Sequence, residues 1–102
     1  MKPTAYIFSP TGKKKIKMPK DKQIFTDIEM AEMFGRAVSF TQCGENKILC
    51  FSEDVTLPIN PLTTPARRMG LLDYTQSIHG NAMIADAELI VPMLLKHKIQ
   101  EY

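Results

Sequence analysis

Polar and positively charged residues gather at one proline-rich bend, which runs from Leu57 to Arg68 as LPINPLTTPARR. Thr64 followed by Pro65 predicts the start of a short helix, with Thr64 as the N-cap and Pro65 at the first helical position. Free backbone N–H groups at a helix start attract anions, and the two arginines would lie close to that start. The bend therefore suits a phosphate group or an acidic partner. The candidate binding residues are Asn60, Thr63, Thr64, Arg67 and Arg68.

The same residues also have a purely structural interpretation. Asn60 would hold a turn, Thr64 would cap the helix, and the two arginines would form a solvated face. Both interpretations stay open at the level of the sequence, because caps and turns use the residue types that anion sites use.

A second cluster of polar residues is His79-Gly80-Asn81, inside the apolar segment IHGNAMIA. A histidine beside a glycine bulge could act as an acid or a base. Catalysis by histidine usually needs an orienting acid and a nucleophile or metal, and the spacing names neither. We therefore expect His79 and Asn81 to contribute to partner binding, and we expect no catalytic residue, metal site or cofactor.

The two cysteines, Cys43 and Cys50, flank a short turn and do not have the spacing of metal ligands. Both fall in apolar, strand-like runs, which favours buried free thiols in a reducing compartment. A disulfide between them would require the two side chains to face each other across a hairpin.

Charge is divided unevenly along the chain. Residues 1–22 contain seven lysines against Asp21 alone, a net charge of +6, and the total of +2 leaves −4 for the remainder. Such a split can mark a surface for nucleic acid or an acidic partner, here Lys13, Lys14, Lys15 and Lys17. We favour another interpretation, in which lysines on an exposed hairpin discourage pairing at a sheet edge, because this segment contains no arginine.

The first half of the chain predicts a hairpin and a helix. Thr4–Ser9 and Lys13–Met18 read as strands around a Pro-Thr-Gly turn. Thr26-Asp27-Ile28-Glu29 is a capping box, in which the hydroxyl and the carboxylate each accept a backbone N–H of the other residue. The helix that it opens would end at Gly35, with Phe25 and Met30 as a hydrophobic staple.

The second half predicts another hairpin, a bend and a final strand. Ala37–Cys43 alternates, and Lys47–Phe51 is apolar enough to be buried on both faces. A short helix would run from Pro65 to about Tyr74. Ile78–Ala85 reads as a last strand with a turn or bulge at Gly80-Asn81.

A terminal helix would begin near Asp86 or Val91 and end at Gln100. Val91, Leu95, Ile99 and Tyr102 share its inner face by spacing. The chain therefore predicts a single α+β domain, with a small, mainly antiparallel sheet of about five strands packed by two or three helices. Its parts are a lysine-rich β-hairpin (1–22), a core (24–86) and a C-terminal helix (87–102).

The composition, 44% hydrophobic and 24% charged, is typical of a soluble globular protein. The longest apolar run, Leu89 to Leu95, is interrupted by Pro92 and is too short to span a membrane. Lys2 is not followed by the apolar region of a signal peptide. We expect a cytoplasmic protein without a membrane partner.

Three segments resemble a family of small phage- and plasmid-borne domains of unknown function. They are the helix, glycine and strand EMAEMFGRAVSF (29–40), the strand and bend ILCFSEDVTLPINPLTT (48–64), and the closing strand IHGNA (78–82). The resemblance covers roughly residues 24–86. A departure is Arg36, where the family commonly has a second glycine. The resemblance implies an accessory protein of a mobile element, with no activity attached.

Together these observations favour a non-enzymatic binding protein that disables a component of host defence by direct contact, in the bacterial cytoplasm. One alternative is a sponge that binds a phosphate-bearing nucleotide signal at Thr64–Arg68. Another is nucleic-acid binding by the basic hairpin, which is less favoured. The apolar helix face that ends at Ile99 and Tyr102 would suit a symmetric homodimer.

Overall fold

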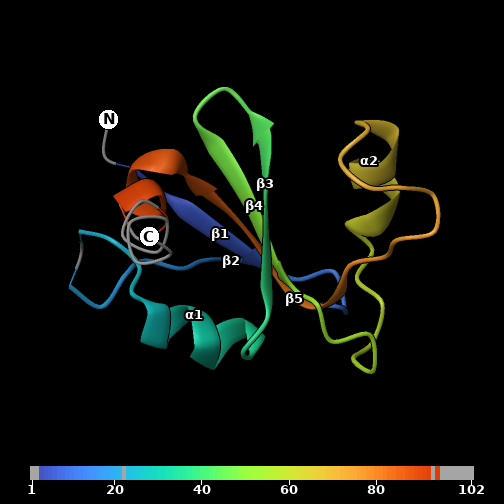
Figure 1. Ribbon diagram of the computed structural model, residues 1–102, viewed down its shortest axis with the longest axis horizontal. Coiled ribbons are helices and arrows are strands. Elements are labelled where there is room, and N and C mark those ends of the chain that lie inside the picture. The colour runs from blue at the N-terminus through green and yellow to red at the C-terminus, as the bar shows by residue number, and fades with distance from the viewer. Residues whose placement is uncertain (1–2, 22, 93, 95–102) are drawn as a thin grey trace, which may run out of the picture.

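The computed structural model describes residues 3–21, 23–92 and 94, and its centre is a five-stranded antiparallel sheet (Figure 1). The strand order is β2-β1-β5-β4-β3, so the last strand of the chain lies between two hairpins. The elements are β1 (Ala5–Phe8), β2 (Lys14–Ile16), α1 (Asp27–Phe34), β3 (Val38–Gly44), β4 (Lys47–Ser52), α2 (Thr63–Arg68), β5 (His79–Asp86) and the short 3-10 helix η1 (Ala87–Leu89).

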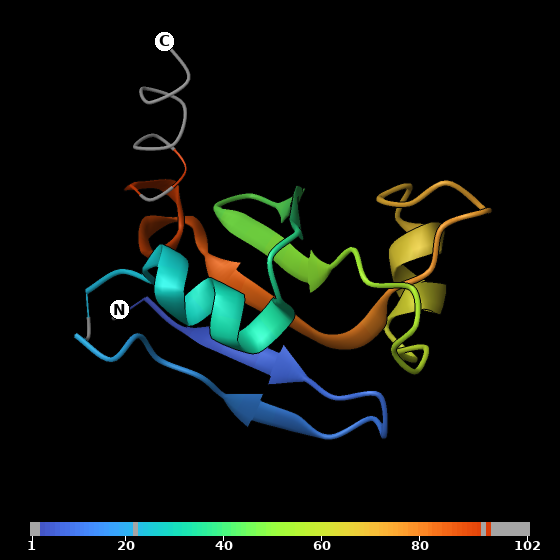
Figure 2. The ribbon, with the colours of Figure 1, turned by 60° about the horizontal axis from the view of Figure 1, so that its bottom comes forward.

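The predicted α+β class is confirmed, since α1 and α2 pack against opposite faces of the sheet (Figures 1 and 2). All five predicted strands are present, with ends that differ from the expected ones by at most two residues. The predicted bulge also exists. Opposite the step from Phe51 to Ser52, β5 advances from Ala82 to His79, and Gly80 takes a φ of 72°.

The two faces of the sheet carry separate buried clusters. On the α1 side, Phe25, Met30 and Phe34 pack with Cys50 and Met83. On the α2 side the cluster consists of Leu49, Phe51, Ala66, Leu72, Ile78 and Ala82. Strand β4 contributes to both, which confirms the prediction that it is buried on both faces.

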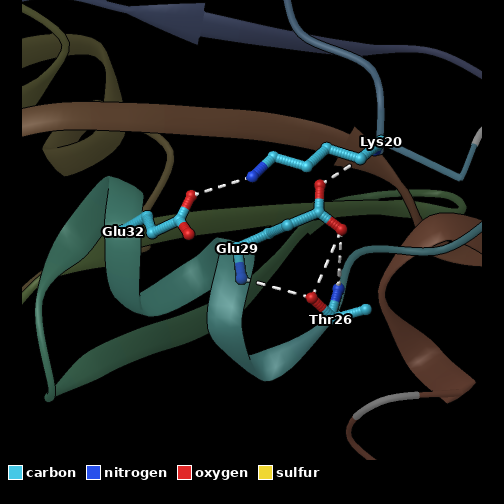
Figure 3. A network of polar contacts seen from close by, with 4 residues as sticks. All are labelled: Lys20, Thr26, Glu29 and Glu32. Atoms are coloured by element: carbon cyan, nitrogen blue, oxygen red, sulfur yellow. Dashed lines mark hydrogen bonds and ion pairs between the residues drawn. The ribbon is translucent and has the colours of Figure 1, made fainter.

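Helix α1 begins with the capping box that the sequence predicts (Figure 3). The Glu29 N–H donates to Thr26 Oγ1 at 3.2 Å, and Glu29 Oε1 accepts the Thr26 N–H at 3.3 Å. Glu29 is buried and its second oxygen accepts the Lys20 N–H at 3.0 Å. Ile28, by contrast, is 71% exposed, so the buried stripe of the helix is rotated away from it.

The predicted start of the second helix is wrong. α2 begins at Thr63 with Leu62 as its N-cap, no side chain caps it, and Pro65 is its third residue. The physical reason is that the chain already turns at Asn60, whose Oδ1 accepts the Leu62 N–H and whose carbonyl accepts the Thr63 N–H. The helix also ends early, at Arg68, shortly before Gly70 at a φ of 74°.

The end of the chain is described only in part. η1 follows β5 directly, and the Leu94 N–H donates to the Ile90 carbonyl at 3.2 Å. Most of the predicted terminal helix lies outside the described residues, including Leu95, Ile99 and Tyr102 of its proposed inner face. Within the described residues, no helix has the length and apolar character needed to cross a bilayer.

The capping box gives a first prediction. Glu29→Ala leaves the N–H groups of Thr26 and Lys20 without their acceptor, so the free energy of unfolding should fall by about 2 kcal/mol. Urea denaturation followed by circular dichroism measures this loss.

Glu32→Ala is the matched control, because Glu32 is also a glutamate of α1 that contacts Lys20, in an exposed ion pair at 3.3 Å. Exposed pairs contribute about 0–1 kcal/mol, so this variant should stay close to the wild type. Equal losses in the two variants would contradict the role of the buried carboxylate.

Candidate functional site

The bend predicted to bind a phosphate is organised around the side chain of Asn60, which is only 1% exposed. Its Nδ2 donates to the carbonyls of Phe8 and Gly80, both at 2.9 Å, and its Oδ1 accepts the Leu62 N–H at 2.9 Å. These bonds connect the bend to β1 and to the bulge of β5. The amide of Asn60 is therefore fully used inside the chain.

Two further residues of the bend are also engaged within the chain. Thr63 Oγ1 accepts the Ile78 N–H at 2.8 Å. Arg67 donates through Nη2 to the Gln76 carbonyl at 2.7 Å and to Ser77 Oγ at 2.9 Å, and thereby holds the loop after α2. Among the five candidates, only the exposed Thr64 and Arg68 have side chains without a hydrogen bond or ion pair to another described residue, and the Thr64 backbone N–H donates to the Pro61 carbonyl at 3.3 Å. The five candidates thus follow one another along the bend, and three of them have side chains engaged in contacts within the chain.

His79 and Asn81 lie at the bulge of β5, but their side chains have different neighbours. His79 Nδ1 lies 2.8 Å from the Leu57 carbonyl, which can only accept, so Nδ1 carries the proton. Asn81 is exposed and lines a hollow of about 290 Å³ with Lys13 and Lys15. Among the described residues, no group of three or more histidine, cysteine or acidic side chains is placed to hold a metal ion.

The basic hairpin brings a lysine onto aromatic rings. The Lys14 ammonium lies 4.3 Å from the centre of the Tyr6 ring and 5.9 Å from that of Phe8. Strand β2 is an edge of the sheet, as expected for a lysine-rich hairpin. Just after β2, the Lys17 N–H donates to the Ala5 carbonyl. Along the sequence these rings lie in the strand before the lysines, and only the pairing of β1 with β2 brings Phe8 opposite Lys14.

An apolar cleft, which no pattern in the sequence indicates, lies between α2 and the sheet. It has a volume of about 200 Å³, and its walls consist almost entirely of carbon atoms. Met69, directly after α2, is 62% exposed and forms part of the wall. The lining of the cleft includes Cys43, Lys47, Leu49, Ala66, Met69 and Ile84.

The cleft continues across the sheet as a strip of apolar side chains. Ile84 in the cleft is the register partner of Tyr6, and Tyr6 is in turn the partner of Ile16. Side chains of directly opposed residues lie on the same face, so these three form one row. Ile16 is 65% exposed, and Lys14 covers the Tyr6 ring beside it. We call this row, with Lys14, the apolar strip.

One end of the cleft carries an ion pair between Lys47 and Asp86. Asp86 Oδ2 also accepts the Thr4 N–H at 2.7 Å. The hydrogen bond from Lys47, followed by the one from Thr4, holds the pKa of Asp86 below its ordinary value, and the same pair raises the pKa of Lys47. Lys47 therefore stays charged at the cleft but is already partnered.

The two cysteines lie on opposite faces and are both free thiols. Cys50 belongs to the α1-side core, where burial raises its pKa to about 12. Cys43 lines the cleft, and burial raises the pKa of its thiol as well. The hairpin register opposes Cys50 to Phe40 and not to Cys43, so a disulfide between the two does not fit this arrangement.

The chain matches no family model, no curated protein and no solved structure among those with which it was compared.

Asn60 gives the second prediction. Asn60→Ala leaves one buried carbonyl, one half-buried carbonyl and one half-buried N–H without their partners, so the free energy of unfolding should fall by about 3 kcal/mol. Urea denaturation checks this. Asn81→Ala is the matched control, because the same substitution at an exposed position should change stability by about 0.5 kcal/mol at most. A loss at Asn60 no larger than at Asn81 would contradict the structural role.

Asp86 gives a prediction on pH. A carboxyl whose pKa is lowered by folding contributes stability above its unfolded pKa, and this stability is lost as the pH falls through the folded pKa. Asp86→Asn should therefore make the loss of stability between roughly pH 5 and pH 2 shallower than in the wild type. Thermal melts across this range measure it, with the same substitution at an exposed aspartate, Asp73→Asn in the loop before β5, as the control. Parallel profiles of Asp86→Asn and the wild type would refute the assignment.

Proposed function

We propose that this chain is a non-enzymatic binding protein that acts by direct contact with a partner protein, through the cleft beside α2. The observation that carries the proposal is the cleft itself, a carbon-lined hollow of about 200 Å³ that continues into the apolar strip. Its volume suits one or two apolar side chains, which gain about 25 cal/mol for each Å² removed from water.

The surroundings of the cleft indicate the chemistry of the partner. An apolar side chain would enter between Met69 and Ile84, and a second would lie on Tyr6 and Ile16. The exposed Lys14 ammonium beside this strip would meet a carboxylate. An amphipathic helix with apolar anchors and flanking acidic residues meets these requirements, as in other helix-in-groove contacts.

The biological setting comes from the motif resemblance. We propose a protein of a phage or other mobile element that acts in the bacterial cytoplasm and disables a host defence protein. The short segments that resemble phage- and plasmid-borne domains support this setting, and the cleft supplies a surface for the contact.

The other ligands receive less support from the geometry. A nucleotide at the bend would have to compete with the bonds that Thr63 and Arg67 make within the chain. The cluster of Tyr6, Phe8 and Lys14 favours nucleic acid more specifically, since aromatic rings next to lysines stack on bases. Base stacking on Tyr6, however, would first have to displace Lys14 from the ring.

The test compares two substitutions that introduce the same charge on opposite faces. Met69→Glu places a carboxylate at the cleft, and Ile28→Glu places one on the exposed side of α1. Purified bacterial defence effectors are titrated with the wild type and both variants by calorimetry. We expect one effector to bind the wild type and Ile28→Glu equally and Met69→Glu about tenfold more weakly or worse, which corresponds to about 1.4 kcal/mol.

The thiol of Cys43 reports independently on the cleft. The bound effector should slow its reaction with a maleimide at alkaline pH, whereas Cys50 should react only on unfolding. If no effector binds, or if Met69→Glu binds as well as the wild type, the proposal fails. Binding of single-stranded nucleic acid that weakens steeply with salt would instead favour the alternative.

A further inference from the structure

Strand β3 forms one edge of the sheet, and the phase of its hydrogen bonds can be read from its start. The Glu53 N–H donates to the Ala37 carbonyl at 3.0 Å, so the residue pair 37 and 53 bonds across the hairpin. Bonding directions alternate along an antiparallel strand. Val38, Phe40 and Gln42 therefore direct their N–H and C=O groups outward, where no described segment pairs with them.

This edge is unlike the opposite one. The outer edge of β2 belongs to the run Lys13-Lys14-Lys15-Ile16-Lys17, and lysines are a common protection against edge pairing. β3 has the sequence VSFTQCG and carries no charged residue. The longer of the two edges is thus the one without this protection, which marks it as a place where another strand can add.

We propose that β3 pairs with β3 of a second copy of this chain, antiparallel and around a two-fold axis at Phe40. This register opposes Phe40 to Phe40, Val38 to Gln42, and Ser39 to Thr41. Each residue that directs its backbone outward gains both hydrogen bonds. The Phe40 pair and the two Val38–Gln42 pairs lie on the α1 side. On the α2 side the Ser39 hydroxyl, which donates to Glu53 Oε1 at 3.0 Å, can accept from the Thr41 hydroxyl of the other copy. Aromatic and hydroxyl pairs are favourable cross-strand combinations.

The ends of the strand support a second copy as the occupant. In this register Arg36 of one copy lies beside the turn with Glu45 of the other, so opposite charges meet at both ends. The axis is perpendicular to the sheet, so one face of the dimer carries α1 of both copies and the other face carries α2 of both copies. Such a contact is closed, and the lysines of β2 keep the joined sheet from extending further.

The test is the mass of the particle in solution. Sedimentation equilibrium over a series of concentrations should show the wild type rising from one chain to two. Gln42→Pro removes an outward N–H, which an edge strand tolerates, and should abolish the dimer while the circular dichroism spectrum stays native. Gln42→Thr, which keeps the N–H and favours a strand, should dimerise like the wild type.

A covalent trap fixes the register. Opposed residues that are not hydrogen-bonded lie about 4.5 Å apart at Cα, close enough for a disulfide. Ser39→Cys with Thr41→Cys, in a Cys43→Ala background, should give covalent dimers on oxidation. Lys13→Cys with Lys15→Cys in the same background, at the same spacing along the exposed β2 edge, should not.

Each outcome decides the proposal. A wild type that stays monomeric overturns the proposal and leaves the edge to a strand of a different protein. A Gln42→Pro variant that still dimerises also overturns the proposal. If Gln42→Pro fails to fold, the trap decides, and equal yields of covalent dimer from the two cysteine pairs overturn the proposal.

Discussion

A single buried amide, that of Asn60, determines the position of α2 relative to the sheet. Its donors reach the end of β1 and the bulge of β5, and its acceptor oxygen starts the turn into α2. The bulge is fitted to the same place. A Cβ built on Gly80 would lie 2.8 Å from the Leu57 side chain, and its φ of 72° is one that glycine readily adopts. Bend and bulge thus fix each other, and α2 follows from both.

The cleft is a consequence of this anchoring. α1 packs closely because its buried stripe, with Met30 and Phe34, lies directly on the sheet. α2 is short, and the residues next to its start and end are held through Asn60 and through the bond of Arg67 to the Gln76 carbonyl. It reaches the sheet mainly through Ala66, a small side chain. The space that a larger residue would fill is open on one side, and this asymmetry between the faces gives the molecule its candidate binding surface.

Local signals predicted the elements well. The capping box of Thr26 and Glu29, the two hairpins and the bulge at Gly80 all depend on residues close together in the sequence. The predictions failed where a distant partner decides. A carbonyl 52 residues away holds the Asn60 side chain in place, and Asn60 in turn accepts the Leu62 and Thr63 N–H groups at the turn that starts α2 ahead of Thr64. A helix start read from Thr-Pro alone cannot include such a contact.

Prediction of the candidate site from the sequence fails for the same reason, because distant partners decide which bonds form. Asn60, Thr63 and Arg67 have residue types that suit both an anion site and a structural corner, and only the positions of Ile78 and Gln76 show which bonds form. The cleft and the apolar strip depend on the strand order, because β5 brings Ile84 next to Tyr6. No sequence pattern specifies that the last strand enters between the two hairpins.

The position of β5 between the two hairpins also explains why polar side chains form hydrogen bonds at both of its ends and an ion pair at one of them. The two hairpins do not pair with each other, so β5 alone determines their register. Asn60 ties the bulge at one end to β1, and Asp86 at the other end accepts the Thr4 N–H and pairs with Lys47 of β4. A slip by one residue would turn every side chain of β5 to the other face and would break both sets of bonds. Because Ala82 and Met83 serve different cores, the register that these bonds select is also the one in which each face is correctly filled.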